Sequence, residues 1–145
     1  MRARARYAAR MVTIQATYEG DLCCTSVHGP SEHTVKTDAP KDNMGLGRYF
    51  SPTDLVATAL ATCILTTLGI VAKRREIDLK GAEATVEKHM NAEPRRIGRL
   101  PVAVTIEGSY SDEEKLVLER AAKTCPVHKS LHPDVDAPIE FCWKG

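Results

Sequence analysis

The feature that most constrains this chain is a long apolar run behind a strong helix-start signal. Ser51 suits a helix cap, Pro52 suits the first helical position, and Asp54 follows three residues after the cap, at the positive end of the helix dipole. The run continues to about residue 75, is apolar almost all round and is rich in alanine. It predicts a central helix packed on several sides, and its threonines and glycine favour a buried helix over a membrane span.

Shorter runs of strand character flank this helix. Residues 12–19, 22–28 and 32–37 are separated by turn formers and predict a three-stranded meander, and residues 38–50 predict a long loop. Residues 79–90 and 97–107 predict a second hairpin.

Pro101 favours a start at a sheet edge for the second strand of that hairpin.

The C-terminal part predicts two further helices and a closing strand. Ser111 and Glu114 form a capping-box pattern before an amphipathic helix. Cys125 precedes Pro126, which suits the first position of a short helix, and residues 139–143 predict the last strand. The order of elements indicates an α+β fold.

The length of 145 residues fits one domain, which we expect to span residues 11–145. Residues 1–10 carry four arginines and no acid. We expect them to form a disordered extension, with Met11 as an alternative start.

Charge and cysteine content narrow the partners and the compartment. The net charge of +1 comes from 20 basic and 19 acidic residues spread along the chain, so we expect neither a nucleic acid nor a membrane as partner. The five cysteines are an odd number, and no signal-peptide core precedes the first strand. A reducing compartment, the cytoplasm, is expected.

Two cysteines are candidates for chemistry. At a helix cap, Cys125 would face unpaired amides that stabilise a thiolate, so we expect an acidic thiol there, with His128 and Lys129 adding positive charge. The alternative is a small capping residue. Cys63, inside the apolar helix, alone suggests core filling. Because 62 positions (125 − 63) separate the two, only the fold can bring them together.

Two segments together suggest a family. SPTDLVATALATC at residues 51–63 and AAKTCPVHKSL at residues 121–131 closely resemble the two cysteine motifs of the OsmC/Ohr family, the osmotically inducible and organic hydroperoxide resistance proteins. The predicted order of strands and helices from about Met11 onward is similar to that family's layout.

The resemblance implies an intertwined homodimer with two long helices back to back and active sites at the subunit interface. It also implies that Cys63 attacks the peroxide and becomes a sulfenic acid, and that Cys125 resolves it to a disulfide. A partner dithiol then restores both thiols. This assignment makes Cys63 the attacking thiol, whereas the cap argument favours Cys125.

The chain departs from the family's peroxidases at one position. Those enzymes place an Arg–Glu pair around the attacking thiol, with the Glu directly after the proline of the helix start, where this chain has Thr53. Asp54 lies about half a turn away from Cys63 around the helix axis and suits a cap only. Arg48 is the candidate arginine for substrate binding, against the alternative of a solvated loop charge. A divergent member with weaker activity is expected.

Three functions follow from these patterns. The first is a thiol-dependent peroxidase for organic hydroperoxides that uses Cys63 and Cys125 and needs no metal or organic cofactor. The second is a non-enzymatic module that binds a small ligand or senses redox state, which Thr53 motivates. The third is a metal site formed by Cys63, Cys125 and His128.

Overall fold

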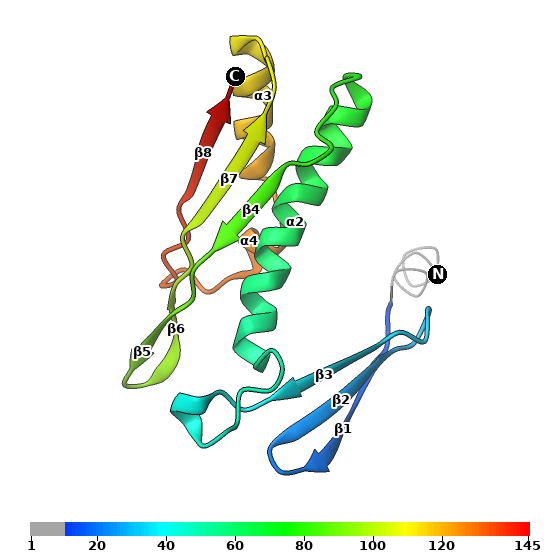
Figure 1. Ribbon diagram of the computed structural model, residues 1–145, viewed down its shortest axis with the longest axis vertical. Helices are drawn as coiled ribbons and strands as arrows, with labels where there is room; N and C mark the ends of the chain where they lie inside the picture. Colours follow the sequence, from blue (N-terminus) through cyan, green and yellow to red (C-terminus); the bar gives the residue numbers. More distant parts are fainter. Residues whose placement is uncertain (1–10) are drawn as a thin grey trace, which may run out of the picture. The chain divides into compact units, whose positions relative to one another are not determined.

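The computed structural model describes residues 11–145, so the expected extension at residues 1–10 lies outside the described residues. The described residues form two compact units, residues 11–52 and residues 53–145. The predicted α+β class is confirmed, with a strand meander, a long helix, a second set of strands, two shorter helices and a closing strand in that order (Figure 1).

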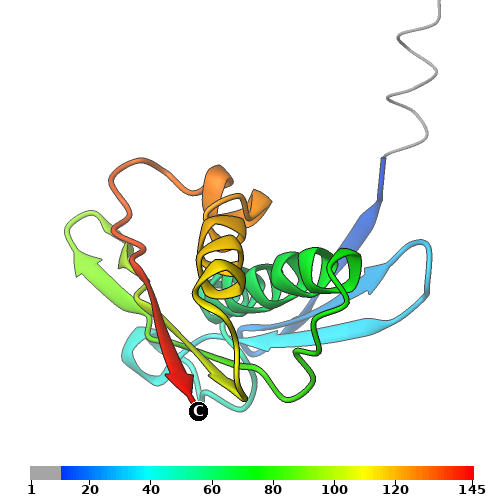
Figure 2. The same cartoon turned by 90° about the horizontal axis from the view of Figure 1, so that it is seen from above.

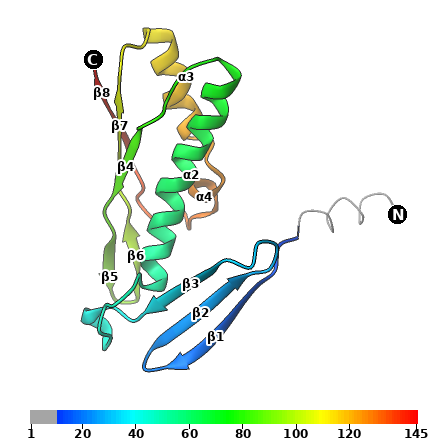
Figure 3. The ribbon, with the colours of Figure 1, turned by 45° about the vertical axis from the view of Figure 1, so that its right-hand side comes forward.

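The first unit contains the predicted meander. Its three strands pair antiparallel in the order of the chain (Figure 3). They are β1 (Ile14–Gly20), β2 (Cys23–His28) and β3 (Thr34–Asp38). The predicted loop after β3 contains one turn of 3-10 helix, η1 (Lys41–Asn43).

The long helix α2 (Pro52–Arg74) belongs to the second unit from its second residue onward, and its bounds match the prediction to within a residue. The helix is long because its apolar run contains no proline after Pro52, so the helical turns continue to Arg74. Glu76 has a left-handed backbone, with φ of 57°, and ends the helical path.

The strands of the second unit form two sheets. β4 (Glu83–Val86) pairs antiparallel with β7 (Val102–Glu107), and β7 pairs parallel with β8 (Ile139–Lys144). β5 (His89–Ala92) and β6 (Arg95–Arg99) form a separate antiparallel pair. The predicted hairpin is therefore confirmed, although both of its arms are interrupted.

The prediction for Pro101 is wrong. The strand that follows it, β7, is the central strand of its sheet, with β4 on one side and β8 on the other. Pro101 instead lies in the break between β6 and β7, where its missing amide does not interrupt a ladder. Its carbonyl oxygen accepts a hydrogen bond of 3.2 Å from the Glu87 amide, in the matching break between β4 and β5. The first arm also begins later than predicted, at Glu83.

Two further helices follow the strands. α3 (Asp112–Ala122) starts with the predicted capping box, in which the Ser111 hydroxyl accepts from the Glu114 amide and the Glu114 carboxylate accepts from the Ser111 amide. α4 (Pro126–Ser130) is a single short helix. Figure 2 shows α2 and α3 on the same side of strands β7 and β8.

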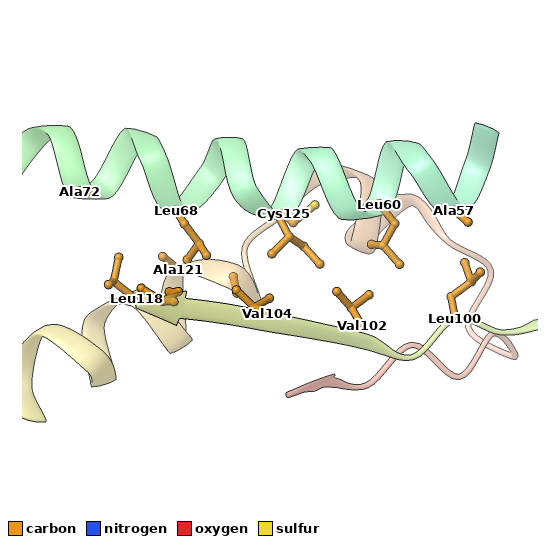
Figure 4. Packing of buried hydrophobic residues seen from close by; sticks show 13 residues of the cluster. Ala57, Leu60, Leu68, Ala72, Leu100, Val102, Val104, Leu118, Ala121 and Cys125 are labelled. Atoms are coloured by element: carbon orange, nitrogen blue, oxygen red, sulfur yellow. The ribbon is translucent and has the colours of Figure 1, made fainter. Parts of the chain in front are cut away.

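The core of the second unit lies between its helices and β7. Alternate residues of β7 are buried, as expected for a strand with one covered face. Figure 4 shows these side chains meeting those of α2 and α3. Fully buried large side chains in this cluster include Leu60, Ile64, Leu68, Val104, Ile106 and Leu118.

Candidate active site

Cys125 lies at the junction of α3 and α4. Its amide donates to the Ala122 carbonyl at the end of α3, and its carbonyl accepts from the Lys129 amide in α4. Its thiol is the cap of α4, since the sulfur accepts a hydrogen bond of 3.5 Å from the His128 amide. The predicted cap position is thus confirmed. The side chain is 0% exposed and belongs to the apolar core of the second unit (Figure 4).

Cys63 projects from the middle of α2, and is half-buried against the same core. Its thiol and the thiol of Cys125 are joined by a side-chain hydrogen bond. The fold therefore brings together the two sulfurs that lie far apart in the sequence. α2 and the junction of α3 with α4 hold them in place, and the core around Cys125 shields one of them from water.

The pKa of Cys125 is raised above that of an ordinary thiol. Burial is the main cause, and the hydrogen bond with Cys63 and repulsion from a charged Cys63 act in the same direction. The amides of His128 and Val127 lower the pKa, but they are outweighed. The expectation of an acidic Cys125 is therefore wrong. The sequence indicates the capping amides, whereas the burial that opposes them depends on the fold.

The His128 ring contacts the segment between α4 and β8. Its Nε2 lies 2.9 Å from the Ala137 carbonyl oxygen. Because that oxygen only accepts hydrogen bonds, Nε2 carries a proton and donates it.

Among residues 11–145, no cluster of three or more His, Cys, Asp or Glu side chains is suited to hold a metal ion.

Arg48 lies in the first unit, and its guanidinium is fixed there. Its Nε and its backbone amide donate to one carboxylate oxygen of Asp38, at 2.8 and 3.0 Å. Its Nη2 donates to the sulfur of Cys23 at 3.0 Å and to the Asp21 carbonyl at 3.3 Å. Arg48 is thus an anchored cation rather than a solvated loop charge.

Asp38 is the partner that the sequence did not reveal. Its carboxyl is 0% exposed, and hydrogen bonds from Arg48 lower its pKa from an ordinary 3.8 to about 2. The Cys23 pKa is raised, because burial and the Asp38 charge outweigh the attraction of Arg48. Asp38 ends β3, and Arg48 follows ten positions later. No local sequence pattern indicates that these two residues pair.

Another residue missed in the sequence is Lys88, in the break between β4 and β5. Its ammonium lies 2.7 Å from a carboxylate oxygen of Asp54 and 2.8 Å from the Thr53 hydroxyl. Asp54 is therefore more than a capping acid, as it also binds a largely buried lysine. The contact ties the start of α2 to the strand break, and its residues are 35 and 34 positions apart (88 − 53 and 88 − 54).

Three further cysteines are Cys23 and Cys24 in the first unit and Cys142 in the second. All five cysteines are free thiols. Cys142 is exposed on β8, and Cys23 contacts Arg48 within the first unit. Cys142 is consequently a useful reference thiol for experiments on the pair.

In a comparison with known protein families, the model of the family described as OsmC-like protein matches residues 45–140. No curated protein matches the chain. Among solved structures, a candidate osmotic stress induced and detoxification response protein from Psychrobacter arcticus is 44% identical. The alignment covers 91% of this chain and 96% of the chain in that structure, with a TM-score of 0.87.

Two more distant structures share the fold. An OsmC-like protein from Mycoplasma pneumoniae has a TM-score of 0.80 at 19% identity and covers 94% of this chain and 99% of its own. A structure from Legionella pneumophila, named an organic hydroperoxide resistance protein OsmC, has a TM-score of 0.69 at 20% identity. It covers 90% of this chain and 96% of its own.

Proposed function

Because the chain belongs to the OsmC-like protein family, we propose that it is a thiol-dependent peroxidase that reduces organic hydroperoxides through Cys63 and Cys125. The observation that carries the proposal is the hydrogen bond between the two thiols inside the second unit. Named hydroperoxide resistance proteins with the same fold support the substrate class.

Cys63 is the attacking thiol in this proposal. As a thiolate it attacks the outer oxygen of the hydroperoxide, the O–O bond breaks, and the alkoxide leaves and takes a proton to become an alcohol. Cys63 is left as a sulfenic acid, oxidised by two electrons. The half-buried position of Cys63 supports this role, because a peroxide must reach the attacking sulfur.

Cys125 then resolves the sulfenic acid. Its raised pKa keeps it protonated at neutral pH, so it does not compete as a thiolate for the peroxide. Its sulfur attacks the sulfur of Cys63, the S–O bond breaks, and the hydroxide leaves with the proton of Cys125 as water. The product is a Cys63–Cys125 disulfide, and a dithiol reductant returns both residues to thiols.

The proposed assembly is a homodimer built on α2. This helix is long and apolar enough to cross a membrane, yet only 33% of its most apolar stretch is buried. Its uncovered side includes Ile70, which is 50% exposed, and Thr62, Thr66 and Gly69. A second copy of α2 would cover this side with the same small and apolar residues.

We also propose a cytoplasmic location, where thiols are kept reduced and a dithiol partner is available.

For Arg48, we propose a role in binding substrate. Its guanidinium is already held in place, so binding would cost little further loss of side-chain entropy. Arg48→Met tests it, with a raised KM for hydroperoxide expected and an unchanged KM contradicting it.

Turnover with matched variants tests the peroxidase directly. Purified protein, reduced lipoamide and tert-butyl hydroperoxide are combined, and peroxide loss is followed. We expect Cys63→Ser to abolish turnover, Cys125→Ser to stop after one equivalent, and Cys142→Ser to match the natural protein. Equal rates for the natural protein and Cys63→Ser would reject the proposal.

A second candidate function is a non-enzymatic module that binds a small ligand or senses redox state. Thr53, bonded to Lys88, favours it, because the family's peroxidases have a glutamate at that position. Native mass spectrometry of freshly purified protein would show a retained ligand. Fast peroxide turnover by protein that carries no ligand would exclude this candidate.

A further inference from the structure

The His128 ring joins α4 to the segment that precedes β8. Its Nε2 donates to the carbonyl oxygen of Ala137 at 2.9 Å, nine positions further along the chain. The imidazole is partly buried, so water competes for this hydrogen bond less than it would at the surface. One side chain of a five-residue helix is therefore bound to a separate part of the second unit.

The acceptor of this hydrogen bond is itself held in place. On one side of Ala137, the Asp136 carbonyl accepts from the Leu100 amide at 2.8 Å. On the other side, the Pro138 carbonyl accepts from the Val102 amide at 2.9 Å. These bonds tie the segment to β7 and to the break before β7. The Ala137 carbonyl is thus a fixed point to which α4 is attached.

His128 also contacts the Cys125 sulfur through its backbone. The His128 amide donates to this sulfur at 3.5 Å, so the placement of α4 determines where that donor lies. On its other side, the Cys125 amide donates to the Ala122 carbonyl at the end of α3, at 3.3 Å. The buried thiol is therefore held between two attachments, one through α3 and one through α4.

The placement of Cys125 matters most in the step that resolves the sulfenic acid. In that step the Cys125 sulfur must meet the Cys63 sulfur in line with the S–O bond that breaks. A sulfenic acid that is not resolved reacts with a second hydroperoxide. It then becomes a sulfinic acid, which thiols do not reduce, and the hydroperoxide becomes an alcohol. The alignment of Cys125 therefore sets the balance between resolution and overoxidation.

We propose, resting on the peroxidase function proposed above, that His128 is a positioning residue for the resolving step. Its ring, bonded to the Ala137 carbonyl, holds α4 so that the Cys125 thiol is aligned with Cys63 for disulfide formation. The ring exchanges no proton with the reacting atoms and acts only through α4. It needs only an N–H donor, which Nε2 supplies in this hydrogen bond.

Three substitutions separate this hydrogen bond from the volume of the ring. His128→Phe keeps an aromatic ring without a donor, and His128→Leu removes both, whereas His128→Gln supplies an amide donor. Val127 and Leu131 pack against the core and keep α4 attached in each variant. His132→Leu is the matched control, because the exposed His132 ring contacts Asp134, two residues away.

A single-turnover experiment measures both steps of the reaction. Each protein is mixed with cumene hydroperoxide without reductant, and samples are quenched over time with dimedone, which traps sulfenic acid, and with N-ethylmaleimide. Mass spectrometry then follows the Cys63 peptide.

We expect His128→Phe and His128→Leu to consume the first peroxide at the natural rate but to form the disulfide about fivefold more slowly, or slower still. In excess peroxide, more of their Cys63 should become sulfinic acid. His128→Gln and His132→Leu should match the natural protein in both steps.

Three results would overturn the inference. The first is disulfide formation at the natural rate in both His128→Phe and His128→Leu. The second is slow formation in His128→Gln, because the donor would then not be what matters. The third is an equal slowing of peroxide attack and disulfide formation, which would assign His128 a general role in folding.

Diamide separates this inference from the peroxidase proposal, because it joins two thiols without peroxide. One thiol adds to its N=N bond, the second thiol displaces the adduct, and diamide leaves as a hydrazine. With diamide in excess, so that this displacement limits the rate, closure should again be about fivefold slower in His128→Phe. Slow closure together with absent peroxide turnover would remove the peroxidase and keep the positioning role. Turnover together with equal closure rates would do the opposite, and failure of diamide to join Cys63 to Cys125 in the natural protein would overturn the inference as well.

Discussion

Oxidising Cys63 and Cys125 to a disulfide should raise the free energy of unfolding by about 4 kcal/mol. The magnitude follows from the loop of 62 residues (125 − 63) that the bond would close, because closure restricts the unfolded chain. The folded state should add little strain, since the two thiols already hydrogen-bond to each other. Nearly the full entropic effect is therefore expected.

Urea unfolding measures this difference. The chain has one tryptophan, Trp143, which packs against Tyr110 and Phe141 in the second unit and reports its unfolding by fluorescence. With a slope near 2 kcal/mol per molar urea, the midpoint should rise by about 2 M on oxidation. Oxidised and reduced samples are compared at one protein concentration, because an assembly's stability depends on it.

Cys125→Ala is the matched control. It cannot form the bond, so diamide should leave its unfolding midpoint unchanged. An oxidised natural protein that gains less than about 1 kcal/mol would show that the sulfurs are not positioned to bond without strain. An equal gain in Cys125→Ala would assign the effect to other cysteines and refute the reasoning.

Three further predictions concern the core, the assembly and the first unit. Leu68→Ala should lower the free energy of unfolding by about 2–5 kcal/mol in urea titration, whereas Leu116→Ala, 46% exposed, should change it far less; equal losses would contradict the described core. Ile70→Arg should convert the proposed dimer to a monomer by light scattering, and an unchanged mass would place the interface elsewhere. Asp38 should titrate near a pKa of about 2 by NMR, and Arg48→Met should move that pKa back toward 3.8. Since the folded-state pKa is the lower one, ionised Asp38 stabilises the fold above about pH 4, and this stabilisation is lost as the pH falls toward 2.

Local signals made most of the architecture predictable. The pattern of Ser51 and Pro52 indicates the start of α2, and the pattern of Ser111 and Glu114 indicates the start of α3. These signals work because each depends on contacts within a few residues. The prediction from Pro101 failed because the position of a strand in its sheet depends on which strands pair with it. The parallel partner β8 comes nearly forty residues later in the chain.

The site was only partly predictable. The cysteine motifs identified Cys63 and Cys125, but the pKa of Cys125 depends on burial by distant segments of the second unit. Asp38 beside Arg48 and Lys88 beside Asp54 were missed for the same reason. Each is a pairing between side chains on separate elements, and neither has a spacing that a local pattern encodes.

The most direct test of the redox pair is a stoichiometric titration without reductant. Reduced protein is mixed with increasing cumene hydroperoxide, and the cysteine peptides are mapped at each step. We predict one Cys63–Cys125 disulfide and one alcohol for each peroxide consumed, with Cys142 still free. Consumption of peroxide with Cys125 left as a free thiol, or no consumption at all, would contradict it.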